Sequence, residues 1–98
     1  MKKRFVVCVN SATNEQNKQF KEFIRENGLG WWHWLRNVWL LSDSKGKFSA
    51  AEIRDQLGRN YPGVYSLVLE LRGDDDTWSG FGPKKEGKNM FKWIRDNW

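Results

Sequence analysis

Two helix-start motifs divide this chain into segments and thereby limit the folds open to it. Thr13 and Ser49 are each followed three residues later by Gln or Glu. Each pair has the form of a capping box, in which the two side chains accept hydrogen bonds from free N–H groups at a helix N-terminus. Apolar residues at helical spacing follow both motifs. We therefore predict one helix over 14–27 and a second helix that ends near Asn60, ahead of a Pro-Gly pair.

Runs rich in β-branched and aromatic residues flank these helices. We expect a first strand over Arg4–Val9, whose unbroken apolarity suits a central position in a sheet. Two further strands are expected within Trp31–Asp43, joined near Arg36-Asn37 by a tight turn or a bulge. Alternation then predicts a fourth strand over Val64–Leu71. This order is typical of a ferredoxin-like βαββαβ sandwich, so we predict an α+β fold of that type.

The predicted fold leaves one face of the sheet without helices, and this face needs a cover. We expect residues 1–73 to form the ferredoxin-like domain and residues 74–98 to form an extension that packs on the sheet or on a dimer partner. The extension is expected to hold a short strand around Trp78 and a short helix capped by Asn89. The whole remains a single domain, because a chain of 98 residues buries one modest core. The residues expected to cover the sheet or a dimer interface are Trp78, Phe81, Phe91, Ile94 and Trp98.

Composition and charge narrow the classes of partner. The net charge is +5 and the sequence pI is near 9.6, which permits attraction to RNA, DNA or anionic lipid. Cys8 is the only cysteine, so we expect neither an intrachain disulfide nor a Cys-based metal site, and a reducing cytoplasm fits best. No apolar run approaches the roughly 20 residues of a membrane span, so we expect a soluble protein with no membrane partner.

Several segments together resemble a known family. They are the strand sequence RFVVCV, the string Trp31-Trp32-His33, the step Ile53-Arg54-Asp55 and the motif Trp78-Ser79-Gly80-Phe81. In these the chain resembles small bacterial proteins of the SinR family, a group distinct from the helix-turn-helix biofilm repressor of that name. Their fold is similar to that of the CRISPR-associated endonuclease Cas-two and of related toxin nucleases. The likeness spans about Lys3 to Phe81 and implies a ferredoxin-like homodimer.

The resemblance also bears on catalysis. In nucleases of the Cas-two type, an Asp at the end of the first strand of each copy holds a metal across the two-fold axis. The matching residue here is Asn10, whose amide oxygen carries no formal charge and attracts Mg²⁺ or Mn²⁺ less strongly than a carboxylate. The resemblance therefore implies a dimeric nucleic-acid-associated accessory protein without a cofactor, in which catalysis is lost or much reduced. The alternatives are a metal-dependent endoribonuclease or toxin nuclease, using Mg²⁺ or Mn²⁺, and a protein–protein interaction module that binds no nucleic acid.

The remaining candidate residues each have two interpretations. His33 is the only histidine, and its ring suits general acid–base catalysis or packing beside its Trp neighbours. The acidic run 74–76 lacks the ligand spacing of a Ca²⁺ loop, so we expect a solvated turn. Lysines of the extension are candidates for phosphate contacts, while Phe91 or Trp93 stacks on bases or seals the sheet. These lysines are Lys84, Lys85, Lys88 and Lys92.

Overall fold

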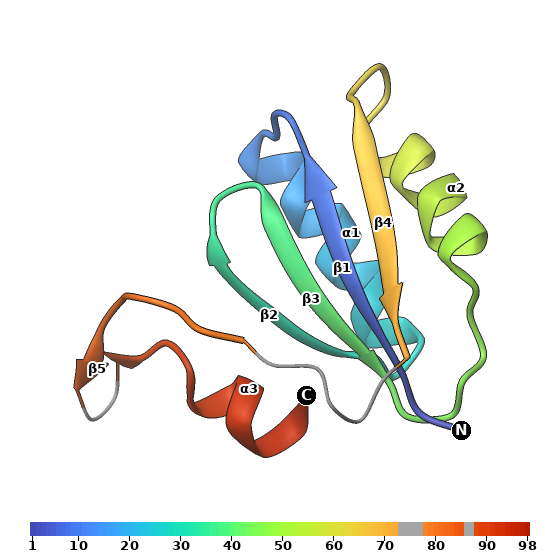
Figure 1. Ribbon diagram of the computed structural model, residues 1–98. Coiled ribbons are helices and arrows are strands. Elements are labelled where there is room, and N and C mark those ends of the chain that lie inside the picture. The colour runs from blue at the N-terminus through green and yellow to red at the C-terminus, as the bar shows by residue number, and fades with distance from the viewer. Residues whose placement is uncertain (73–77, 86–87) are drawn as a thin grey trace.

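The computed structural model of the chain describes residues 1–72, 78–85 and 88–98 (Figure 1). Its elements are β1 (Lys3–Val9), α1 (Asn14–Glu26), β2 (Gly30–Leu35), β3 (Val38–Asp43), α2 (Ala50–Asn60), β4 (Ser66–Leu71), β5 (Lys84–Lys85), β6 (Lys88–Asn89) and α3 (Lys92–Asn97). Four of the strands form one antiparallel sheet in the order β2-β3-β1-β4, and β5 pairs with β6. The predicted α+β class is confirmed.

Both long helices begin at the predicted capping boxes. Thr13 Oγ1 accepts a hydrogen bond from the Gln16 N–H at 3.1 Å, and Gln16 Oε1 accepts one from the Thr13 N–H at 2.9 Å. The Ser49 and Glu52 side chains make the equivalent pair at the start of α2. α1 ends one residue before the predicted position, and α2 ends at the predicted residue. The local capping signals are therefore sufficient to define these two helices.

The connection between β2 and β3 combines the two alternatives expected for it. Leu35 lies opposite Val38, so only two residues make the turn. The pairing register also shifts between Trp32 and Leu35, which marks an irregularity in β2. The hairpin therefore has a tight turn and a disturbed strand beside it.

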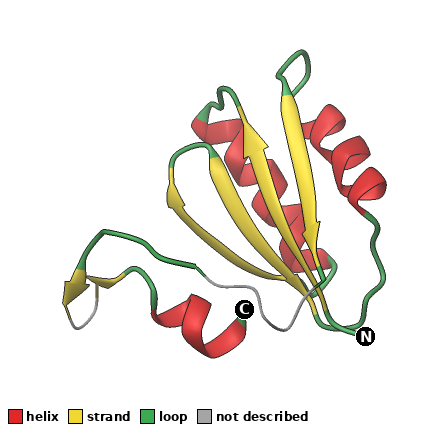
Figure 2. Cartoon of the chain, viewed as in Figure 1, coloured by secondary structure: helices red, strands yellow, loops and turns green. Residues whose placement is uncertain are grey.

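The helices α1 and α2 cover one face of the sheet, as Figure 2 shows. Phe20 of α1 packs edge-on against Trp39 of β3, with ring centroids 5.2 Å apart. The Tyr61 hydroxyl donates to Asn17 Oδ1 at 2.8 Å, and burial raises the pKa of Tyr61 to about 12. We call this cluster the helix-covered core, and its buried members are Phe5, Val7, Val9, Phe20, Ile24, Leu29, Trp39, Leu41, Ile53, Leu57 and Tyr61.

The opposite face of the sheet is covered in part by the extension. Trp32 Nε1 of β2 donates to the Met90 carbonyl oxygen at 2.6 Å, and Trp98 Nε1 donates to the Leu41 carbonyl oxygen at 3.1 Å. These bonds fasten the extension over the β2–β3 half of the sheet. On β4, Leu67 and Leu69 remain about half exposed. We call the cluster beneath the extension the extension core, and its buried members are Trp32, Leu40, Met90, Phe91 and Ile94.

The detailed structure of the extension differs from the prediction. α3 starts after Phe91, which makes no side-chain capping bond, so the prediction of Asn89 as the helix cap is wrong. Asn89 Oδ1 instead accepts a hydrogen bond from the Phe91 N–H at 3.1 Å, which ends the hairpin before the helix begins. Within residues 78–85 the strand lies at β5 rather than around Trp78. None of the described helices is long and apolar enough to span a membrane.

Candidate nucleic-acid interface

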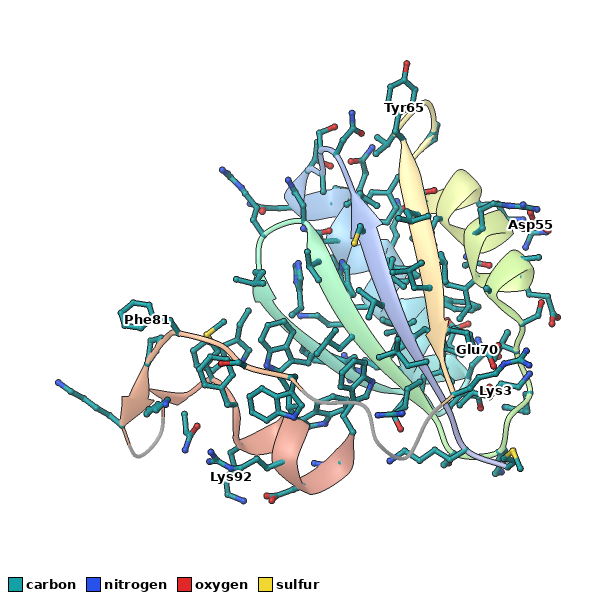
Figure 3. The ribbon with its side chains drawn as sticks, in the orientation of Figure 1. Lys3, Asp55, Tyr65, Glu70, Phe81 and Lys92 are labelled. Carbon is teal, nitrogen blue, oxygen red and sulfur yellow. The ribbon has the colours of Figure 1, made fainter. Side chains whose placement is uncertain are left out.

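A cavity of about 660 Å³ opens at the end of the sheet where β1 begins and β4 ends. β1 and β4 are antiparallel, and Arg4 lies opposite Leu71, so the basic N-terminal residues lie beside Arg72. Figure 3 shows Lys3 and Glu70 close together at this end. We call this the basic cavity, and it is lined by Met1, Lys2, Lys3, Arg4, Glu70, Leu71, Arg72 and Trp98. Among the described lining residues, four cationic side chains stand against one carboxylate, a balance that favours an anionic ligand.

Neighbouring groups position the cationic side chains of the basic cavity. Lys2 Nζ donates to the Asn97 carbonyl oxygen, and Lys3 Nζ donates to the Phe48 carbonyl oxygen at 2.8 Å. An ammonium group has three N–H donors, so each lysine can still donate to an anion. Arg72 Nε donates to Glu70 Oε2 at 2.7 Å, and the Arg4 guanidinium lies 5.6 Å from the centre of the Trp98 ring. The cavity therefore joins several prepositioned donors to an aromatic ring.

A second, more apolar cavity of about 320 Å³ lies between the sheet and the extension. It shares Leu71 and Trp98 with the basic cavity, so the two cavities adjoin at these residues. We call this second cavity the aromatic groove. Its aromatic lining residues are Trp32, Trp78, Phe81, Phe91 and Trp98. A ligand that carries both charged and aromatic groups could contact cationic side chains in one cavity and aromatic rings in the other.

Asn10, the residue that matches the metal-binding Asp of the Cas-two-type nucleases, has a structural role in the chain. Its N–H donates to the Tyr65 carbonyl oxygen at 3.1 Å, and its Oδ1 accepts from the Tyr65 N–H at 3.0 Å. These two bonds hold the end of β1 against the residue that precedes β4. In the described part of the chain there is no group of three or more His, Cys, Asp or Glu residues that could hold a metal ion.

His33 packs against the helix-covered core. Its ring is stacked on Trp39, with centroids 3.7 Å apart and an interplanar angle of 6°. Its Nε2 lies 3.0 Å from the Arg36 carbonyl oxygen, to which it donates when that nitrogen carries the proton. Burial lowers the pKa of His33, and the positive charge of Lys21 lowers it further. The residue lines neither the basic cavity nor the aromatic groove.

The lysines predicted for phosphate contacts occupy different environments. Lys84 and Lys85 are exposed on β5, and Lys84 Nζ lies 5.8 Å from the ring centre of Phe91, which lines the aromatic groove. Lys92 donates to Asp96 within α3, and this bond lowers the pKa of the Asp96 carboxyl group. The Lys88 side chain and the acidic run 74–76 lie outside the described residues.

The residues expected to cover the sheet separate into buried and exposed groups. Phe91 and Ile94 belong to the extension and are buried in the extension core, and Trp98 is half-buried. Trp78 is 41% exposed, with its ring 5.6 Å from that of Phe91, and Phe81 is 99% exposed. Phe81 therefore contributes almost nothing to the packing of this chain.

The sequence analysis did not identify the basic cavity as a site. Lys2 opens the short basic run Lys2-Lys3-Arg4, but Arg72 is 70 positions away from it in the sequence. The predicted ferredoxin-like fold class contained a signal that was not used. In a ferredoxin-like sheet the first and last strands are antiparallel neighbours, so residues that open the first strand meet those that close the last.

No protein family, curated protein or solved structure matches this chain. The resemblance to the SinR family therefore remains a hypothesis.

Proposed function

We propose that this protein is a nucleic-acid-associated accessory protein that binds a phosphate backbone without cleaving it. The basic cavity is the observation that carries this proposal. It brings Lys2 and Lys3 from the start of the chain to Arg72 at the end of β4, beside the ring of Trp98. Neutralising phosphates with such side chains releases counterions, which is the main driving force for binding nucleic acids.

Two observations support binding without cleavage. The Asn10 side chain is neutral, and its oxygen already accepts a hydrogen bond from the Tyr65 N–H. His33 is stacked on Trp39 and does not line the basic cavity. A cleaving enzyme needs a metal or an acid–base group within reach of the phosphate, and neither candidate meets that need.

The proposal extends to family and assembly. We propose a ferredoxin-like fold related to the SinR and Cas-two-like proteins, and the order β2-β3-β1-β4 with antiparallel neighbours supports it. We also propose a homodimer in the cytoplasm. Leu67 and Leu69 on the edge strand β4 support the homodimer, because a second copy would remove their half-exposed side chains from water. The free thiol of Cys8 is compatible with a reducing compartment.

One observation favours a second candidate function, a protein–protein interaction module. Tyr65, Leu67 and Leu69 present a row of exposed apolar groups along β4, and such a row is able to receive another protein. This function requires no positive potential at the basic cavity. The two candidates therefore differ in whether binding to nucleic acid exists and depends on salt.

The test is a titration of labelled single- and double-stranded RNA and DNA at low and high salt, with Mg²⁺ or Mn²⁺ present and product length checked afterwards. We expect binding that weakens steeply with salt and leaves the strands intact. The double variant Lys2→Ala, Arg72→Ala should bind more weakly, with a salt slope reduced by roughly 1 to 2. The control Lys18→Ala, Arg59→Ala removes the same charge from exposed positions on α1 and α2 and should bind like the unmodified protein.

Two results would contradict the proposal. Absence of binding at low salt would leave the protein–protein interaction module. Metal-dependent shortening of the strands would establish the nuclease alternative. Cleavage that persists in Asn10→Ala would show that residues other than Asn10 are catalytic.

A further inference from the structure

The orientation of Phe81 is determined by the glycines on either side of it. A Cβ atom at Gly80 would lie 2.5 Å from Phe91 Cε1, and one at Gly82 would lie 2.2 Å from Met90 Sδ. Both glycine backbones therefore lie directly on the extension core. Phe81 lies between these two inward positions and is itself 99% exposed, so its ring points away from the extension core. Figure 3 shows Phe81 at the outer edge of the extension, away from the sheet.

The exposure of Phe81 is unusual for a side chain of its kind. Phe81 is 99% exposed, although a phenylalanine gains about 1.5 to 3 kcal/mol when it is fully buried. Trp78, three residues earlier, is 41% exposed and packs on the Phe91 ring at 5.6 Å. Both residues line the aromatic groove, and exposed apolar side chains around a cavity are typical of an interaction site.

The charges around Phe81 indicate the chemistry of its ligand. Lys84 and Lys85 follow it on β5 with exposed side chains, and the aromatic groove continues into the basic cavity through Leu71 and Trp98. A ligand that follows this path meets an aromatic section between two cationic sections. Single-stranded nucleic acid has that pattern, with flat bases for the rings and phosphates for the cations.

We propose that the exposed Phe81 ring, at the mouth of the aromatic groove, stacks on an unpaired base of single-stranded RNA or DNA while Lys84 and Lys85 contact the backbone. This inference rests on the proposed function and adds a preference for single strands. In a duplex each base is stacked on its neighbours, so its face is closed to a protein ring until the strand opens.

The test compares labelled oligo(dT) and oligo(U) with a duplex of the same length by fluorescence anisotropy. We expect the single strands to bind more tightly, and Phe81→Ala to weaken that binding by about 5- to 150-fold, the range for one stacked base. The salt slope should stay unchanged, because Phe81 carries no charge. Phe81→Trp should keep the affinity, whereas Phe81→Leu, which is apolar but cannot stack, should lose it. Tyr65→Ala is the matched control, because Tyr65 is 79% exposed and lines neither cavity.

The outcomes separate this inference from the proposed function. Salt-dependent binding that does not change in Phe81→Ala, or that favours the duplex, would overturn the inference and leave the proposed function intact. Absence of binding by the unmodified protein would overturn both. Equal losses in Phe81→Ala and Tyr65→Ala would also overturn the inference. Retention of affinity in Phe81→Leu would overturn the inference as well. A change in the oligomeric state of Phe81→Ala without a change in its nucleic-acid affinity would also overturn it, because either result would mean that Phe81 contacts protein.

Discussion

The two faces of the sheet are packed by different means. The helix-covered core has eleven buried side chains beneath α1 and α2, helices of 13 and 11 residues that both start at capping boxes. The extension core has five buried side chains among the described residues, beneath a helix of six residues without a side-chain cap. The aromatic groove lies on the extension side, and the basic cavity opens at the end of the sheet beside it. Stability is therefore concentrated on the helix-covered face, and the candidate binding surface lies on the other face and at the end of the sheet.

Matched truncations of phenylalanine should show this difference most strongly. Phe20→Ala removes a fully buried ring from the helix-covered core, and we expect the free energy of unfolding to fall by about 3 to 5 kcal/mol. Phe91→Ala should cost about 2 to 3 kcal/mol, because its site borders the aromatic groove and can relax or fill with water. Urea unfolding followed by circular dichroism measures both losses. Phe20→Leu provides a milder variant if Phe20→Ala does not fold. A larger loss in Phe91→Ala would reverse the comparison.

Replacing a glycine by alanine should change the free energy of unfolding in opposite directions in the two regions. Gly80→Ala places a methyl group against the Phe91 ring, so we expect a loss of about 1 to 3 kcal/mol as the ring is displaced. Gly58 lies within α2, and no heavy atom of the described residues comes within 4 Å of its added Cβ. Gly58→Ala should therefore stabilise the protein by about 0.5 to 1 kcal/mol. Urea midpoints of the two variants test this, and equal signs would show that the extension does not pack on Gly80.

The smallest expected effect is a pH dependence in the helix-covered core. Burial lowers the pKa of His33 below 6.5, so at mildly acid pH the unfolded chain binds more protons than the folded one. The contribution of His33 to stability is then complete above pH 6.5 and falls as the pH drops below that value. His33→Phe, which keeps a ring on Trp39, should remove this part of the pH dependence. Urea unfolding between about pH 5 and 8 measures it. Identical pH profiles for the two proteins would rule out a contribution from His33.

The parts of the fold that follow from local signals could be predicted from the sequence. The capping residues Thr13 and Ser49 and the alternation along β4 each depend on neighbours a few positions away. The alternation does not say which side of β4 is buried. Val68 packs on the helix-covered core, whereas Leu67 and Leu69 lie on the more exposed side, because α1 and α2 already occupy the first face.

The candidate site could not be predicted in the same way. The basic cavity exists because Arg4 pairs opposite Leu71. These two residues are neighbours in the sheet but lie far apart in the sequence. The exposure of Phe81 arises from contacts of Gly80 and Gly82 with Phe91 and Met90, which no local pattern encodes. The predicted stacking residues Phe91 and Trp93 instead pack in and against the extension core. Long-range contacts, and not residue types, decide which aromatic ring is free.

The arrangement of residues 80–82 also separates two evolutionary pressures within three positions. A side chain at Gly80 meets the Phe91 ring and one at Gly82 meets the more flexible Met90 side chain, so folding alone should keep Gly80 strictly and Gly82 less strictly during random mutagenesis. Nothing in the folding of this chain depends on the Phe81 ring, since its side chain is almost entirely in solvent. A library randomised only at residue 81 would therefore leave expression and stability nearly constant. Any amino-acid preference that emerges from it would report directly on the ligand.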